Sequence, residues 1–224
     1  MAEIYSYEEI DKLVAGKTQL AKSNNPVYLI EWRGIEVIAK KVLDSTAAPH
    51  EIAVHRKIHH PNIVQLIGHT PLNKEFVYLL MEYFPNGSLR SALDKKGKEL
   101  TWSIRLKIAS DIAKAMYFLH GRNILHRDLK AANIMVDTHF EAKLADFGES
   151  LESGASKLTD EAGTLYYMAP EMLKRQPTTS AADVYSFGFS SNLRQNFNII
   201  SELCCVSFLL DKNHTKTMNG LQKR

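Results

Sequence analysis

Residues 126–133 of the chain, with the sequence HRDLKAAN, place a carboxylate, an amine and an amide within six positions. The carboxylate of Asp128 can accept the proton of an attacking hydroxyl group, and the amine of Lys130 can steady a phosphate oxygen. Asn133 and, further along, Asp146 offer oxygen ligands of the kind that Mg²⁺ prefers. Groups of this kind, which position reactants and stabilise charge, are what phosphoryl transfer requires.

Two further motifs follow in the chain, DFG at residues 146–148 and APE at residues 169–171. A single triplet could occur by chance, but three motifs in this order and at this spacing resemble the eukaryotic protein kinases. The resemblance implies an α+β, bilobal fold with a β-rich small lobe and a helical large lobe that is incomplete. It also implies ATP and Mg²⁺ as cofactors, catalytic roles for Asp128, Lys130, Asn133 and Asp146, and metal binding by Asn133 and Asp146.

The pattern of apolar residues predicts the elements that position these groups. Residues 27–32 and 36–42 are rich in β-branched and aromatic residues and are separated by Arg33-Gly34, which indicates a hairpin. Residues 75–81 form a third candidate strand. A helix is expected to begin near Pro49, and a longer helix is expected over residues 101–120, where apolar residues recur at spacings of three and four before Gly121.

Residues 32–40 are similar to the third-strand lysine segment of the tyrosine-kinase-like serine/threonine kinases. The resemblance implies that Lys40 binds the α and β phosphates of ATP and pairs with Glu51. Strand side chains alternate between faces, so a shift by one residue would turn Lys41 inward instead. Lys40 is favoured by its spacing from Trp32, and Lys41 is then a solvated strand lysine. Glu51 has the alternative of being a first-turn acid that complements the helix dipole.

The nucleotide-binding region departs from the family in one segment. Residues 20–27 (LAKSNNPV) occupy the place of a glycine-rich loop but contain no glycine, and Pro26 lacks an amide donor. We therefore expect weak nucleotide binding. Residues 81–89 resemble the hinge between the lobes, which implies that the backbone of Glu82 and Phe84 binds adenine, with Met81 as the gatekeeper. The alternative is an ordinary strand followed by an Asn-Gly turn. Val27 is also expected to bind the nucleotide.

The resemblance also bears on substrate and regulation. Lys130 and residues 163–171 are similar to serine/threonine kinase signatures, which implies protein substrates with Ser or Thr acceptors and a contact of Thr164 with Lys130 and Asp128. The candidate phosphorylation sites in the following loop are four hydroxyls, with Thr159 as first choice: Ser150, Ser153, Ser156 and Thr159. His55 aligns with an apolar stack that includes Leu66, His126 and Phe147. We interpret it as a neutral packed histidine, with a pH-sensitive switch as the alternative.

Composition is that of an ordinary globular domain, with 45% hydrophobic and 24% charged residues. A net charge of +3 is too small to indicate nucleic acid as a partner. The sequence contains no apolar stretch long enough for a membrane span and begins without a secretory signal, so no membrane partner is expected and the cytoplasm is the expected location. Cys204 and Cys205 are adjacent, which suggests neither a disulfide framework nor a metal site.

We expect an N-terminal extension at residues 1–16, a small lobe at 17–83, a partial large lobe at 84–189 and a divergent tail at 190–224. The tail is too polar at its start to continue a buried helix. One interpretation is that its apolar segment at residues 199–210 forms a substitute amphipathic helix, and the alternatives are an altered reading frame, a retained intron or alternative splicing. The most direct function is transfer of the ATP γ-phosphate to Ser or Thr hydroxyls of proteins. The alternative is an inactive pseudokinase or truncated isoform that acts as a protein-interaction module.

Overall fold

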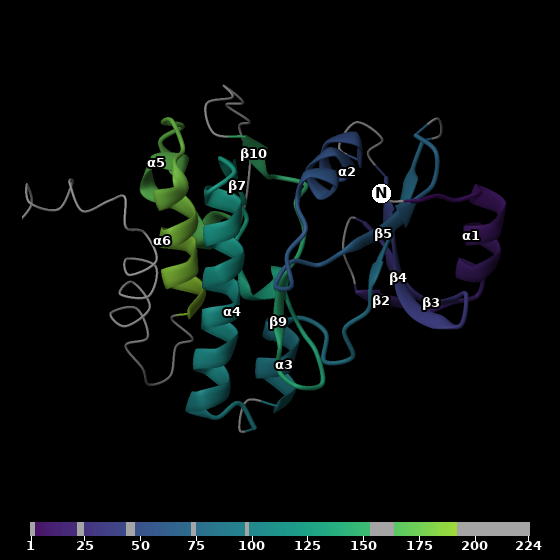
Figure 1. Ribbon diagram of the computed structural model, residues 1–224, viewed down its shortest axis with the longest axis horizontal. Coiled ribbons are helices and arrows are strands. Elements are labelled where there is room, and N and C mark those ends of the chain that lie inside the picture. Colours follow the sequence, from purple (N-terminus) through teal and green to yellow (C-terminus); the bar gives the residue numbers. More distant parts are fainter. Residues whose placement is uncertain are drawn as a thin grey trace, which may run out of the picture.

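The computed structural model describes residues 3–21, 25–43, 48–72, 75–96, 99–152 and 164–191. One part of it is a sheet with two helices, and the other part consists of helices with short strands (Figure 1). The first part contains β1 (Glu3–Ile4), α1 (Tyr7–Val14), β2 (Gln19–Ala21), β3 (Val27–Trp32), β4 (Ile35–Val42), α2 (Ala48–Lys57), β5 (Leu66–His69) and β6 (Val77–Glu82). The expected α+β arrangement, with a β-rich lobe followed by a helical lobe, is confirmed.

The helical part begins after β6. Its helices are α3 (Leu89–Lys96), α4 (Trp102–His120), α5 (Pro170–Leu173) and α6 (Ser180–Ser191), with short 3-10 helices η1 (Ala131–Asn133) and η2 (Leu165–Tyr167). Its strands are β7 (Ile124–Leu125), β8 (Ile134–Val136), β9 (Ala142–Leu144) and β10 (Leu151–Glu152). In these described residues, β8 pairs with β9 and β7 pairs with β10, so each pair frames one side of a loop that carries candidate catalytic residues.

The six strands of the first part form one sheet in the order β1-β5-β6-β4-β3-β2. The hairpin between β3 and β4 turns at Arg33 and Gly34, whose φ angles are 52° and 81°. Two successive positive φ angles give the tight turn that matches the twist of antiparallel strands. The register of β4 therefore follows from the turn, with Trp32 opposite Ile35 and Val27 opposite Lys40.

Helix α1 lies against one face of this sheet. Its N-terminus is capped by Ser6, whose side chain accepts a hydrogen bond from the N–H of Glu9. The helix is anchored by buried Tyr7, Ile10 and Val14, which pack with Trp32, Val37 and Ala39 among others. The described part of residues 1–16, the segment expected as an N-terminal extension, packs on this sheet.

Helix α2 covers the opposite face. Its Ala48 and Ile52 are buried together with Val42, Leu79 and Met81 of the sheet. Successive strand residues point to opposite faces, so Ile38, Lys40 and Val42 face α2 whereas Val37 and Ala39 face α1.

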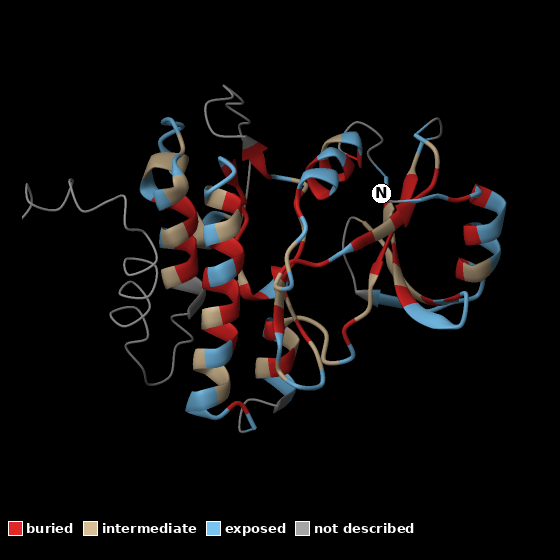
Figure 2. Ribbon diagram, viewed as in Figure 1, coloured by how far each residue is buried: buried red, intermediate tan, exposed pale blue. Residues whose placement is uncertain are grey.

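Helix α4 is the centre of the helical part. Thr101 caps its N-terminus by accepting a hydrogen bond from the N–H of Ile104, and Gly121 stands at its C-cap. Buried residues on α4 and α6 lie in the interior of this part (Figure 2). The helix boundaries agree with the prediction, but Trp102 is 38% exposed and does not belong to the buried face, which begins at Ile108.

Candidate active site

Lys40, not Lys41, faces the candidate site. The Nζ atom of Lys40 lies 3.0 and 3.1 Å from the two carboxylate oxygens of Glu51 and 2.9 Å from Oδ1 of Asp146. The amine of Lys41 points to the other face and lies 3.7 Å from the ring centroid of Phe76. The pairing of Lys40 with Glu51 predicted from the sequence is therefore present. Lys41 packs on aromatic rings rather than being simply solvated, which corrects the interpretation of that residue.

This cluster combines one ammonium group with two carboxylates. Burial alone would lower the pKa of Lys40, but the charges of Glu51 and Asp146 raise it well above its usual value. Burial raises the pKa of Glu51, whereas the ammonium of Lys40 overcomes burial and lowers the pKa of Asp146. The Asp146 side chain is 43% exposed and that of Glu51 only 4%, so Asp146 is the carboxylate open to an incoming ligand.

The loop at residues 126–133 is held by Asp183 of α6. The carboxylate of Asp183 accepts hydrogen bonds from the N–H groups of His126 at 2.9 Å and Arg127 at 2.8 Å. Arg127 has a φ of 67°, a left-handed conformation that a non-glycine residue adopts only when its surroundings hold it there. Asp183 therefore holds the backbone of this loop in place.

Asp128 is the centre of a second cluster. Its Oδ2 accepts hydrogen bonds from Lys130 at 2.5 Å and from the amide of Asn133 at 2.9 Å. Its Oδ1 accepts from both the N–H and the hydroxyl of Thr164, each at 3.0 Å, and Lys130 also donates to that hydroxyl at 2.8 Å. The expected contact of Thr164 with Lys130 and Asp128 is present. A carboxylate held by this many donors keeps one orientation, which is what a proton acceptor requires.

The two clusters are joined through the backbone beside Asn133 and Asp146. The N–H of Ala145, the residue before Asp146, donates to the carbonyl of Asn133 at 2.8 Å. Asn133 and Asp146 are therefore close together. Asn133 uses its NH₂ group on Asp128, which leaves its amide oxygen, and Asp146 holds Lys40 with only one carboxylate oxygen. These oxygens fit a divalent cation that takes its remaining ligands from phosphates and water. Within the described residues, no group of three or more His, Cys, Asp or Glu could hold a metal by itself.

The residues expected around adenine lie on β3, on β6 and, for Phe84, just after β6. Val27 stands opposite Lys40 in the sheet, and Met81 stands opposite Ile38. The side chains of Met81 and Phe84 are buried, whereas Glu82 points its carboxylate away to the N–H of Gln65 at 2.6 Å and to Lys143 of β9. The pair of Glu82 and Lys143 is a contact that the sequence did not indicate. It joins the predicted hinge to the strand that leads to Asp146.

Of the four candidate phosphorylation sites, the structure describes Ser150. Ser150 is buried and donates to the carbonyl of Phe147 at 2.6 Å, so it is inaccessible in this conformation. Ser153, Ser156 and Thr159 lie outside the described residues. The same holds for residues 22–24 in the middle of the glycine-free segment.

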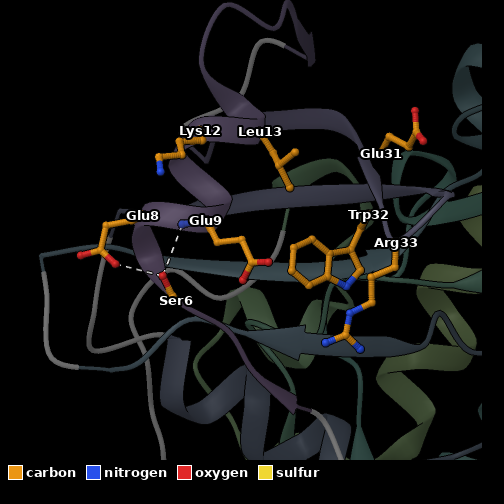
Figure 3. Close-up of a pocket in the computed structure, with 8 residues that line it drawn as sticks. All are labelled: Ser6, Glu8, Glu9, Lys12, Leu13, Glu31, Trp32 and Arg33. Atoms are coloured by element: carbon orange, nitrogen blue, oxygen red, sulfur yellow. Dashed lines mark hydrogen bonds between the residues drawn. The ribbon is translucent and has the colours of Figure 1, made fainter.

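A hollow of about 560 Å³ lies beside α1, and none of the candidate active-site residues line it. Figure 3 shows that its wall combines acidic and basic side chains with the ring of Trp32. It is lined by Ser6, Glu8, Glu9, Lys12, Leu13, Glu31, Trp32 and Arg33. None of the helices in the described part of the chain is long and apolar enough to cross a membrane.

Residues 21–195 match the family described as the protein kinase domain. The chain is 36% identical over 180 residues to a probable serine/threonine-protein kinase, drkA, of Dictyostelium discoideum, which covers 76% of this chain and 28% of the relative. It is 38% identical over 183 residues to the serine/threonine-protein kinase CTR1 of Arabidopsis thaliana, which covers 75% of this chain and 22% of the relative. A probable L-type lectin-domain containing receptor kinase, S.5, of the same plant is 37% identical over 178 residues, covering 72% and 27%.

The chain belongs to the protein kinase domain family. Members of this family use ATP together with a divalent metal. The family match extends through α6 to residue 195, a few residues further than the resemblance recognised from the motifs. The chain spans about a quarter of the length of the curated relatives named above.

Proposed function

We propose that this chain transfers the γ-phosphate of ATP to Ser or Thr hydroxyls of protein substrates. The arrangement of Asp128, Lys130 and Thr164 supports this most directly. The hydroxyl of Thr164 lies 3.0 Å from Oδ1 of Asp128 and 2.8 Å from Lys130, so this site already accommodates an aliphatic hydroxyl between a carboxylate and an ammonium group. The serine/threonine kinases among its relatives support the same class of acceptor.

In the proposed reaction, Asp128 accepts the proton of the substrate hydroxyl as that oxygen attacks the γ-phosphorus. Lys130 stabilises charge on the phosphoryl oxygens, and Asn133 fixes the orientation of the Asp128 carboxylate. Breaking the bond between the γ-phosphorus and the bridging oxygen leaves ADP. Because little covalent chemistry is required of the protein, orientation and charge supply most of the catalysis.

The metal in this proposal is Mg²⁺, bound by Asn133 and Asp146. It would neutralise the phosphate charge when bound, and a site with one carboxylate plus substrate phosphates is typical of Mg²⁺ in phosphoryl-transfer enzymes. Lys40, oriented by Glu51, would bind the α and β phosphates. Val27, Met81 and the backbone of Glu82 and Phe84 would hold the adenine.

We place this activity in the cytoplasm, because ATP and Mg²⁺ are abundant there. The small net charge of +3 favours protein rather than nucleic acid as the second substrate. We also propose the boundaries given above: the N-terminal extension ends at residue 16, the small lobe at residue 83 and the partial large lobe at residue 189.

The test is phosphate transfer from labelled ATP to a mixed protein substrate, with and without Mg²⁺, followed by phosphoamino-acid analysis. We expect phosphoserine and phosphothreonine, and Asp128→Asn should reduce turnover at least about a hundredfold with little change in ATP affinity. Phosphotyrosine as the main product would contradict the proposed acceptor. Binding of ATP without transfer would favour the interaction module instead.

A further inference from the structure

His50 connects two parts of the site that the sequence separates. Its Nε2 lies 2.6 Å from the backbone carbonyl oxygen of Ser150, a residue 100 positions later. A carbonyl oxygen only accepts, so Nε2 of His50 carries the proton of this hydrogen bond. His50 immediately precedes Glu51 on α2, and Ser150 follows the DFG motif by two residues. The contact therefore joins the helix that carries Glu51 to the segment that carries Asp146.

At the Ser150 end of this contact, the backbone is held in a turn by hydrogen bonds. Both the N–H and the hydroxyl of Ser150 donate to the carbonyl of Phe147, at 3.2 and 2.6 Å. The next residue, Leu151, pairs with Leu125 of β7, directly before the loop that carries Asp128. His50 thus binds a buried turn whose position is linked to both Asp146 and the catalytic loop.

At the other end of the contact, the first turn of α2 needs the support that this hydrogen bond gives. Helix α2 begins at Ala48, which places Glu51 in its first turn, where backbone N–H groups lack partners within the helix. Glu51 and Asp146 also repel each other across the single ammonium of Lys40. At Gly148, an added Cβ would lie 3.7 Å from Asp146 Oδ1 and 4.0 Å from Glu51 Oε2, so both carboxylates are close to the backbone of this segment.

We propose that His50 is a positioning residue for the phosphate transfer proposed above, on which this inference rests. Its hydrogen bond to Ser150 holds α2 against the DFG segment, so that Glu51 and Asp146 contact Lys40 at the same time. Without it, α2 moves away, Lys40 keeps one carboxylate partner, and the phosphates of ATP are less well aligned. Loss of alignment lowers kcat more than it raises the KM for the protein substrate.

Three variants of the full chain test this role. His50→Ala removes the donor and places a good helix former in α2, so the helix itself is not weakened. His50→Gln restores an amide N–H at the same distance from Cβ as Nε2. His59→Ala is the matched control, because His59 is an exposed histidine just beyond the end of the same helix.

The first measurement is hydrogen exchange of peptides spanning residues 50–57 and 146–152, which requires no activity. We expect His50→Ala to speed exchange in both peptides about tenfold, the effect of losing one hydrogen bond, and His50→Gln to return it toward the wild-type rate. Faster exchange in α2 alone, or equal changes in His59→Ala, would overturn the connection between the two segments.

The second measurement is kinetic. His50→Ala should lower kcat roughly tenfold or more with little change in the protein-substrate KM, and His50→Gln should recover most of the loss. An unchanged kcat beside faster exchange would overturn the positioning role. If the wild-type chain transfers no phosphate, the proposed function fails by itself, and the exchange experiment still decides whether His50 holds the two segments together.

Discussion

The ring of His55 packs edge-on against the ring of Phe147, with their centroids 5.1 Å apart. Phe147 makes the same kind of contact with His126, also at 5.1 Å. This places a histidine of α2 in the apolar stack that the sequence indicated. The Nε2 of His55 is buried without a hydrogen-bond partner among the described residues, and burial lowers the pKa of His55 to about 4. The interpretation of His55 as a neutral packed histidine is therefore supported.

The low pKa of His55 predicts a specific pH dependence of stability. Above pH 6.5 the ring is neutral in both the folded and the unfolded chain. Between pH 6.5 and about 4 the unfolded chain binds a proton at His55 that the folded chain does not, so stability falls as the pH falls. From pH 7 to pH 5 the loss should be about 2 kcal/mol.

The measurement is urea unfolding at both pH values for the wild type and His55→Leu, which has a similar volume and no proton to bind. The variant should lose about 2 kcal/mol less than the wild type over this range and should be the more stable form at pH 7, because no polar atom is then buried without a partner. His59→Leu, at an exposed position, should keep the wild-type pH dependence. Equal pH slopes for wild type and His55→Leu would contradict the buried neutral state.

The sequence predicted elements that have a clear local pattern. The β3–β4 hairpin followed from two β-rich runs around Arg33-Gly34, and α4 followed from apolar spacing together with Gly121 at its end. In the cluster around Asp128, Lys130 and Asn133 were predictable because they lie within a few residues of Asp128 in one motif, whereas Thr164, 36 positions away, was expected from the resemblance of residues 163–171. In these cases the local signal and the tertiary structure agree.

Other features gave weak local signals or none. Helix α1 has only two turns, so its buried residues Tyr7, Ile10 and Val14 form a short periodic pattern, although Ser6 and Glu9 have the spacing of a capping box. Strands β7 to β10 have two or three residues each and are too short for periodicity to show. The contact of His50 with Ser150 spans 100 positions and depends on the packing of two lobes, which no local pattern encodes.

Separate replacement of Lys40 and Lys41 by Met should distinguish the two lysines. Lys40→Met removes the ammonium group shared by Glu51 and Asp146, and we expect ATP affinity to fall at least about tenfold, the effect of one charge-assisted hydrogen bond. Lys41→Met removes the contacts with the rings of Phe76 and Tyr78 and should leave ATP affinity within about twofold of wild type, because this face is directed toward α1. Calorimetric titration with ATP and Mg²⁺ measures both. A larger loss for Lys41→Met would show that the wrong lysine has been assigned.

Asp183→Asn should weaken both stability and catalysis. Asp183 is fully buried; although burial alone would raise its pKa, hydrogen bonds from His120 and from the N–H of His126 hold the pKa below its usual value. The amide side chain introduced by Asp183→Asn would direct its NH₂ group toward N–H donors or offer one acceptor fewer. Either outcome should lower the free energy of unfolding by about 2 kcal/mol. Because folding lowers the pKa of Asp183, the contribution of this carboxylate to stability is present above about pH 4 and is lost below it.

Urea unfolding and turnover of the same sample test this prediction. Asp94→Asn makes the same chemical change on the exposed side of α3, where Asp94 pairs with Arg90, and should alter stability by less than about 0.5 kcal/mol. If Asp183→Asn unfolds like the wild type, the two N–H bonds to the catalytic loop contribute less than their geometry implies.

Thr164 offers a test of the hydroxyl position next to Asp128. Thr164→Ala removes a hydroxyl that donates to Asp128 and accepts from Lys130, but it leaves the backbone N–H bond to Asp128 in place. The ammonium of Lys130 then loses one oxygen partner and keeps Asp128, so it is less well oriented toward the phosphoryl group. We expect kcat to fall about tenfold with little change in ATP affinity, because Thr164 lies beside Asp128, the proposed acceptor of the substrate proton, rather than beside Lys40.

Thr164→Ser keeps the hydroxyl and should restore most of the activity, whereas a purely structural role of the methyl group would leave the serine variant as impaired as the alanine variant. Initial rates over a matrix of ATP and peptide concentrations separate these outcomes, since loss of alignment lowers kcat and loss of packing would instead appear as reduced stability in urea.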